Sequence, residues 1–320
     1  MNIKRWIGRR EENWQRLDQL LSQVEQKGLK SIKSTEIREL ASLYRSVAAD
    51  LARARTQEVG KTLTQSLQTL TTRGYTQIYQ GSRKQEWQAV KKFYLWGFPA
   101  VVQQTFLYTV VATLLFLLGG LVAWWYAWQD PSFMSLIVPE SLISQVRDRG
   151  ELWMGSIVGI EPLASSNIMI NNISVSFAAV SGGISGGIYT IYIMVFNGLL
   201  IGAVATLVGQ NNLAYPFWAF VFPHGALELP AIFLAGGAGL LIGKAILFPG
   251  KYRRRDAIKI NSYLSAQLVF GIVPLLVIAG IIEGFISPNP AIPDPVKYLL
   301  GIGLFISLVI YLNRKQSTIN

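Results

Sequence analysis

The chain has 320 residues, of which 51% are hydrophobic, and it carries a formal net charge of +11. Only 15% of its residues are charged, well below the roughly 25% of soluble domains, and several apolar runs exceed the ~20 residues that cross a bilayer as helix. The absence of cysteine excludes disulfides, thiolate metal sites and cysteine nucleophiles. We therefore predict an all-α, polytopic helical membrane protein.

Residues 1–97 are predicted to form a soluble, helical, cytoplasmic domain. Apolar residues recur at helical spacing over 3–26 and again over 35–52, with charged residues between them. A third, less regular helix is expected over 63–79. Basic and aromatic residues coincide over 82–97, which favours an elbow helix at the cytoplasmic headgroups. The alternative is a solvated lead-in to the first membrane span.

A transmembrane domain is predicted over 98–313, with Pro99 marking a bend before the first span. It includes an acidic outer segment, 129–166, in which residues 142–152 have the pattern of an amphipathic helix. A short cytoplasmic tail, 314–320, follows. The six predicted spans lie near 105–128, 168–187, 188–209, 223–248, 264–286 and 296–312.

The distribution of charge predicts the orientation of these spans. Residues 1–97 hold 18 basic and 9 acidic side chains, and 244–259 hold 6 basic and 1 acidic, whereas 129–166 hold 2 basic and 5 acidic. Under the positive-inside rule, both termini and the 244–259 loop lie in the cytoplasm. The same rule accounts for the basic total, so no nucleic-acid partner is expected.

Glycine pairs four residues apart predict close helix packing, because small residues let helices approach each other in lipid. The same faces make a homodimer plausible, since they can also pack between chains. The glycines predicted to pack helices are Gly182, Gly186, Gly198, Gly202, Gly239 and Gly243.

His224 is the only histidine of the chain, and Glu228 follows it by four residues, so a helix places both on one face. Pro223 suits the first turn of that helix. One interpretation is a hydrogen-bonded structural pair, and another is a proton or solute path, because ionisable residues inside membranes often line such paths. A metal site needs three or four ligands, so neither a metal nor a cofactor is expected.

Asparagines are predicted to form a polar cluster near the outer leaflet, where they would bond across helices, and Asn171 and Asn172 are predicted to lie at the depth of His224. Glu283, near the outer end of the fifth span, either joins this polar cluster or faces the headgroups. The asparagines assigned to the cluster are Asn171, Asn172, Asn197 and Asn211.

Three stretches together resemble the stage II sporulation protein M family, over about 36–283. The fourth span, PHGALELPAIFLAGGAGLLIG, resembles the family signature, a His-Gly and a Glu followed by small residues. NNISVSFAAVSGGISGGIYTIYIMVFNGLLIG resembles its Asn-bearing helix pair, and ELASLYRSVAADLARAR its cytoplasmic helix. The positions that match are His224, Gly225, Glu228, Gly236, Ala238 and Gly239, then Asn171, Asn172, Asn197 and Gly198, then Tyr44, Arg45, Asp50 and Leu51.

The resemblance implies a non-enzymatic scaffold in the bacterial cytoplasmic membrane, where membrane lipids surround it. This scaffold would position peptidoglycan-remodelling or other envelope proteins. The residues themselves show no Walker loop or dinucleotide fingerprint. The alternative is a transporter or channel for a lipid or small solute that uses the polar cluster. An intramembrane hydrolase is a third, less favoured hypothesis.

Overall fold

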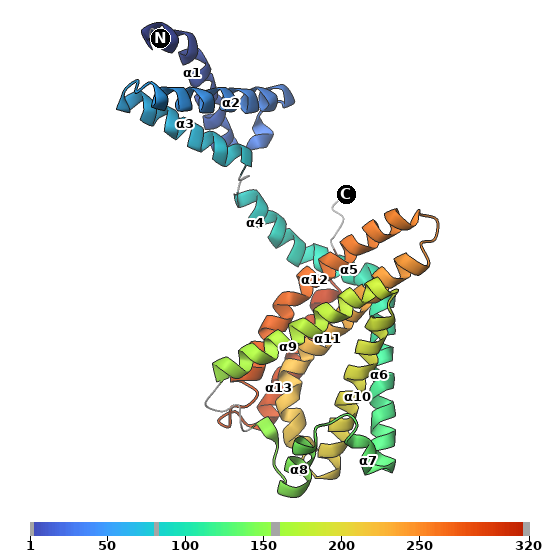
Figure 1. Cartoon of the computed structure of the whole chain (residues 1–320). Coiled ribbons are helices and arrows are strands. Elements are labelled where there is room, and N and C mark those ends of the chain that lie inside the picture. The colour runs from blue at the N-terminus through green and yellow to red at the C-terminus, as the bar shows by residue number, and fades with distance from the viewer. Residues whose placement is uncertain (1–2, 80–82, 155–160, 316–320) are drawn as a thin grey trace. The chain divides into compact units, whose positions relative to one another are not determined.

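The computed structural model describes residues 3–79, 83–154 and 161–315, and these residues form helices and no strands (Figure 1). The chain divides into two compact units, Met1–Lys92 and Phe93–Asn320. The division falls between Lys92 and Phe93, a few residues before the end of the domain predicted over 1–97.

The N-terminal unit consists of α1 (Ile3–Lys27), α2 (Ser34–Thr56), α3 (Lys61–Tyr79) and α4 (Arg83–Lys92). Gly28, with a φ of 80°, follows α1, and Gly60, with a φ of 123°, precedes α3; both are backbone conformations that glycine adopts without steric strain. The first three helices enclose one hydrophobic core. Its buried residues are Trp6, Trp14, Leu17, Leu20, Leu21, Val24, Ile32, Leu40, Val47, Leu51, Ala54, Leu67 and Leu70.

A buried carboxylate links α1 to α2 inside this unit. Asp50 accepts a hydrogen bond from the Nε of Arg10 at 2.8 Å and another from the indole Nε1 of Trp14 at 3.0 Å. The Asp50 side chain is 3% exposed. A buried polar group of this kind is stabilising only when its partners are present, so the position of α1 on α2 is specific.

The chain enters the membrane unit through a π-helical turn, Phe93–Gly97, and α5 (Phe98–Gln104). The hydroxyl of Tyr94 donates to the carbonyl of Phe270 at 2.9 Å, and the hydroxyl of Tyr311 donates to the carbonyl of Tyr94 at 2.5 Å. The predicted elbow over 82–97 is therefore made of two elements, α4 and the π-helical turn. The π-helical turn, which is its aromatic end, packs on the membrane helices. The helix breaks at Thr105, whereas Pro99 lies in the first turn of α5, so the bend predicted at Pro99 is wrong.

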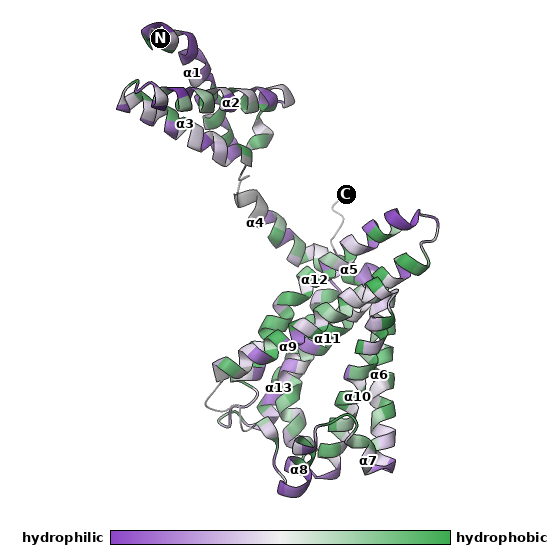
Figure 2. Ribbon diagram, in the orientation of Figure 1, coloured by the Kyte–Doolittle hydropathy of each residue, from purple (hydrophilic) through white to green (hydrophobic). Residues whose placement is uncertain are grey.

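In the described part of the chain, six helices are long and apolar enough to cross a membrane, which confirms the predicted fold class. Figure 2 shows hydrophobic residues along most of their length. The short helices α7 (Pro131–Met134) and α8 (Glu140–Arg149) lie in the predicted outer segment. The six long helices are α6 (Phe106–Gln129), α9 (Glu161–Ser181), α10 (Ile188–Gln210), α11 (Ala214–Leu247), α12 (Arg254–Phe285) and α13 (Asp294–Leu312).

Three of these helices, α9, α11 and α12, begin at least seven residues earlier than predicted. α11 starts at Ala214, so Pro223 lies inside the helix and not in its first turn. Proline is tolerated there because the surrounding helices of a membrane bundle compensate for its missing N–H. α12 starts at Arg254 because its charged first turns continue the helix beyond the apolar stretch.

The turn between α9 and α10 corrects one predicted glycine pair. α9 ends at Ser181, a 3-10 helix covers Gly182–Ser185, and Gly186 and Gly187 reverse the chain with φ values of 72° and 91°, so α10 begins at Ile188, as predicted. Gly182 and Gly186 therefore belong to a turn and do not form a helix face. They are still tightly packed, since a Cβ on Gly182 would lie 2.6 Å from the amide nitrogen of Thr190.

Gly198, Gly202 and Gly239 lie where helices meet within the chain, whereas a Cβ on Gly243 would overlap the backbone of Gly186 and Gly187 in the turn. A Cβ on Gly198 of α10 would overlap the carbonyl oxygen of Phe116 in α6, and one on Gly202 would overlap that of Gly120. In α11, a Cβ on Gly239 would overlap the carbonyl oxygen of Ala179. The backbones touch at these points, and only glycine permits this approach.

Candidate functional site

His224 and Glu228 lie one turn apart in the first half of α11, as the sequence predicted. His224 is 5% exposed. Its Nδ1 lies 3.1 Å from the hydroxyl oxygen of Ser287, and the ring of Phe220 packs edge-on against the imidazole with centroids 5.4 Å apart. The imidazole is therefore fixed from two sides.

Glu283 of α12 joins the pair. Its Oε1 lies 3.8 Å from the Nε2 of His224, and its side chain is 13% exposed. The sequence left open whether Glu283 enters the polar cluster or faces the headgroups, and the structure places it in the cluster. Ser287, which is 1% exposed, was not predicted as a partner, because nothing in its sequence context distinguishes it from a loop serine.

A cavity of about 290 Å³ connects this group with three of the four predicted asparagines. Asn171 and Asn172 of α9 line it, as does Asn197 of α10. The Nδ2 of Asn197 donates to the carbonyl of Ile193 in its own helix at 2.8 Å, so its amide oxygen can accept a further partner. Asn211 does not line this cavity and instead donates to the carbonyl of Leu207 at 2.7 Å.

The two carboxylates of the cavity each have an oxygen without a hydrogen-bond partner. Oε2 of Glu228 and Oε2 of Glu283 are both buried, and neither is bonded to any group in the described part of the chain. The described lining of the cavity contains no lysine or arginine. A buried carboxylate in this situation is expensive unless a proton, water or cation completes it.

An apolar groove of about 500 Å³ between α11 and α13 adjoins the cavity. Phe233, Tyr298 and Phe305 lie along it. The cavity and the groove share four lining residues, which are Trp218, Val221, Gly225 and Leu229. A polar space and an apolar space therefore meet at one face of α11.

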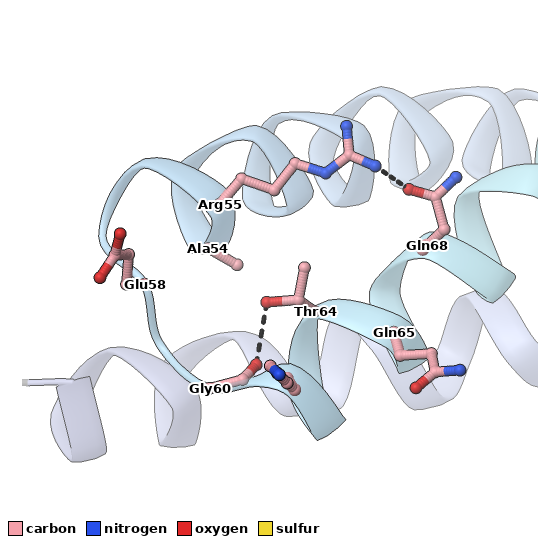
Figure 3. A pocket seen from close by; sticks show the side chains of 8 residues that line it. Ala54, Arg55, Glu58, Gly60, Thr64, Gln65 and Gln68 are labelled. Carbon is pink, nitrogen blue, oxygen red and sulfur yellow. Dashed lines mark hydrogen bonds between the residues drawn. The ribbon is translucent and has the colours of Figure 1, made fainter.

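The N-terminal unit has a more open pocket between α2 and α3, drawn in Figure 3. Arg55 points to Gln68 and is hydrogen-bonded to it, and the hydroxyl of Thr64 donates to the carbonyl of Gly60 at 2.9 Å. None of the residues that the sequence predicted for a site lines this pocket.

Comparison with known proteins identifies two regions of the chain. Residues 112–288, more than half of the sequence, match the family described as Stage II sporulation protein M. Residues 4–80 match a different family, described as Domain of unknown function (DUF8413). The stretch ELASLYRSVAADLARAR, which the resemblance had assigned to the first family, lies in this second region.

Two curated proteins of Methanocaldococcus jannaschii are similar to the chain. The uncharacterized protein MJ0793 is 30% identical over 129 residues, which cover 39% of this chain and 71% of that protein. The uncharacterized protein MJ0706 is 26% identical over 104 residues, which cover 32% of this chain and 47% of that protein. No solved structure matches the chain.

Proposed function

The chain belongs to the stage II sporulation protein M family, and we propose that it acts as a non-enzymatic anchor that positions partner proteins at a membrane. One observation carries this proposal. The N-terminal unit, Met1–Lys92, has a hydrophobic core of its own and is attached to a membrane unit with six long apolar helices. A separately folded unit on a membrane anchor suits the recruitment of partners.

The partners we propose are envelope proteins, including those that remodel peptidoglycan, and the surrounding membrane lipids. The proposed location is a bacterial cytoplasmic membrane with both chain termini inside. A homodimer also belongs to this proposal. Because Gly198, Gly202 and Gly239 are occupied by contacts within the chain, the dimer would form through other surfaces of the membrane unit.

Exposed arginines on α2 offer a specific test of partner binding. Arg38 and Arg45 lie two turns apart on this helix and are both exposed, so they suit an acidic partner surface. The full-length protein, crosslinked in cells and purified in mild detergent, should retain a specific partner that the Arg38→Glu/Arg45→Glu variant loses. Lys61→Glu, an exposed change on α3, serves as the matched control. If variant and control retain the same proteins, this face does not recruit a partner.

A second candidate function is the movement of a lipid or small polar solute through the membrane unit. The observation that favours it is the polar cavity around His224 and Glu228, which adjoins an apolar groove. A lipid headgroup and acyl chain would suit these two spaces. Glu228→Gln should then abolish flux of a labelled lipid or solute in proteoliposomes while leaving the amount of folded protein unchanged. Unchanged flux in that variant would rule out this role for the cavity.

A further inference from the structure

Three metal-ligating side chains converge in the membrane unit. His224 and Glu228 come from α11, and Glu283 comes from α12. Each offers one ligand atom, and the three atoms lie within 4.8 Å of one another. Two ligands of a single zinc ion, each about 2.1 Å from the metal, lie up to about 4 Å apart. The 3.8 Å between His224 and Glu283 is already in this range.

The environment of the two carboxylates favours a bound cation. Glu228 and Glu283 each bury an oxygen without a hydrogen-bond partner in the described residues, and the described cavity lining supplies no basic side chain other than His224. Two ionised carboxylates at close range repel each other strongly in an apolar interior. A single divalent cation between them would remove the repulsion and give both oxygens a partner.

One ring nitrogen of His224 has a hydrogen-bond partner in the protein, as is usual for a histidine that binds a metal through its other nitrogen. Its Nδ1 lies within hydrogen-bond distance of the Ser287 hydroxyl, at 3.1 Å. When Nδ1–H donates to that oxygen, the lone pair of Nε2 is directed away from Ser287 and is free to bind a metal. Nε2 is the nitrogen that lies nearer Glu283, so the hydrogen bond leaves the correct atom available.

We propose that His224, Glu228 and Glu283 bind one divalent first-row transition-metal ion. An imidazole with two carboxylates suits Zn²⁺, Mn²⁺ or Fe²⁺ better than Mg²⁺ or Ca²⁺, which prefer oxygen ligands alone. Water or the amide oxygens of Asn172 and Asn197, which line the same cavity, would complete the coordination. The ion joins α11 to α12. This inference goes beyond both proposed roles, because metal binding requires neither a partner protein nor flux.

The chain makes a sharp spectroscopic test possible, since His224 is its only histidine. The full-length protein, purified in detergent with a tag that contains no histidine, is loaded with Mn²⁺ after treatment with a chelator. We expect about one tightly bound ion per chain by mass spectrometry of the metal. Pulsed electron paramagnetic resonance should show coupling of Mn²⁺ to one imidazole nitrogen, which only His224 can provide.

Variants locate the other two ligands. Glu228→Gln and Glu283→Gln should each weaken the binding of Mn²⁺ and Zn²⁺ at least about tenfold, because a carboxylate ligand contributes more than the outer-shell partners whose loss costs 10–100-fold. Glu140→Gln, in the exposed first turn of α8, is the matched control and should bind as the natural chain does. Size-exclusion chromatography establishes that each variant is folded.

Two results would overturn the inference. One is failure of the natural chain to bind either Mn²⁺ or Zn²⁺ at a stoichiometry near one. The other is binding without nitrogen coupling, which would indicate exposed carboxylates. Both are measured on the unsubstituted protein, so they hold even if a variant fails to fold. Neither result bears on partner recruitment or on flux, which have their own tests.

Discussion

The Nε2 of His224 lies 3.8 Å from Oε1 of Glu283, and through this contact the only histidine of the chain connects two helices. α11 supplies the histidine and Glu228, while α12 supplies Glu283 and leads into Ser287. The other ring nitrogen of His224, Nδ1, lies 3.1 Å from the hydroxyl oxygen of Ser287, just after the C-terminal end of α12. Whatever occupies the site will affect how firmly these helices hold together.

Metal should therefore stabilise the membrane unit. A ligand that binds only the folded state at a concentration of 100 Kd adds about 2.7 kcal/mol to the free energy of unfolding. Zn²⁺ or Mn²⁺ should raise the Tm of the purified protein, and a chelator should reverse the change. Tryptophan fluorescence can follow the transition, since the chain contains nine tryptophans. The Glu228→Gln/Glu283→Gln variant should show no metal-dependent shift, and a shift equal to that of the natural chain would place the stabilising ion elsewhere.

The sequence predicted the six spans because hydropathy over about 20 residues depends on composition alone. It could not predict where helices continue beyond the apolar stretch. The start of α11 at Ala214 and of α12 at Arg254 both depend on helix propagation through residues that are not needed to span the membrane. Gly182 and Gly186 have the spacing of a packing pair, and only the positive φ of Gly186 and Gly187 distinguishes their turn from a helix.

The site was predictable in part for a similar reason. His224 and Glu228 are four residues apart on one helix, and their proximity follows from helical geometry. Glu283 and Ser287 reach the site through the packing of α11 on α12, which depends on tertiary contacts. Depth placed Asn171 and Asn172 near His224, and the outer cluster was expected to include Asn197 and Asn211. Depth gives no direction around the helix axis, so it could not predict that Asn197 lines the cavity and Asn211 does not.

Gly198→Val should destabilise the membrane unit. A Cβ at this position would overlap the carbonyl oxygen of Phe116, so α6 and α10 must separate. Overpacking of this kind typically costs about 1–3 kcal/mol. Gly303→Val is the matched control, because no group of the described structure lies within 4 Å of a Cβ there. The Tm in detergent should fall for Gly198→Val and change little for the control, and equal effects would mean that helix propensity dominates over the contact.

Asp50→Ala should destabilise the N-terminal unit, because it removes the acceptor of both Arg10 and Trp14. The indole N–H of Trp14 is left buried and unbonded, at a cost of about 1–3 kcal/mol. The exposed pair Arg16–Glu39, with an Nε–Oε1 distance of 2.9 Å, gives the contrast. The hydrogen bond from Arg16 lowers the pKa of the Glu39 carboxyl, yet solvent screening leaves an exposed pair of this kind little net effect on stability.

A cysteine reporter can measure this difference in the full-length protein. The natural chain has no cysteine, and Val47 is fully buried in the core of the N-terminal unit. A Val47→Cys background should react with a maleimide only when this unit unfolds in urea. Asp50→Ala should move that transition to clearly lower urea than Glu39→Ala does. Equal midpoints would show that burial of the Asp50 carboxylate adds nothing to stability.

The same lack of cysteine permits a direct test of the proposed orientation. Tyr252 lies between α11 and α12 and is 62% exposed, in the basic segment that the positive-inside rule places in the cytoplasm. Ser141, at the start of α8, is also exposed and belongs to the acidic segment predicted outside. In intact cells, a membrane-impermeant maleimide should label Ser141→Cys and leave Tyr252→Cys unlabelled until the membrane is opened. Because six spans return the chain to its starting side, the reverse pattern would place both termini outside, and labelling of both positions would contradict a membrane between them.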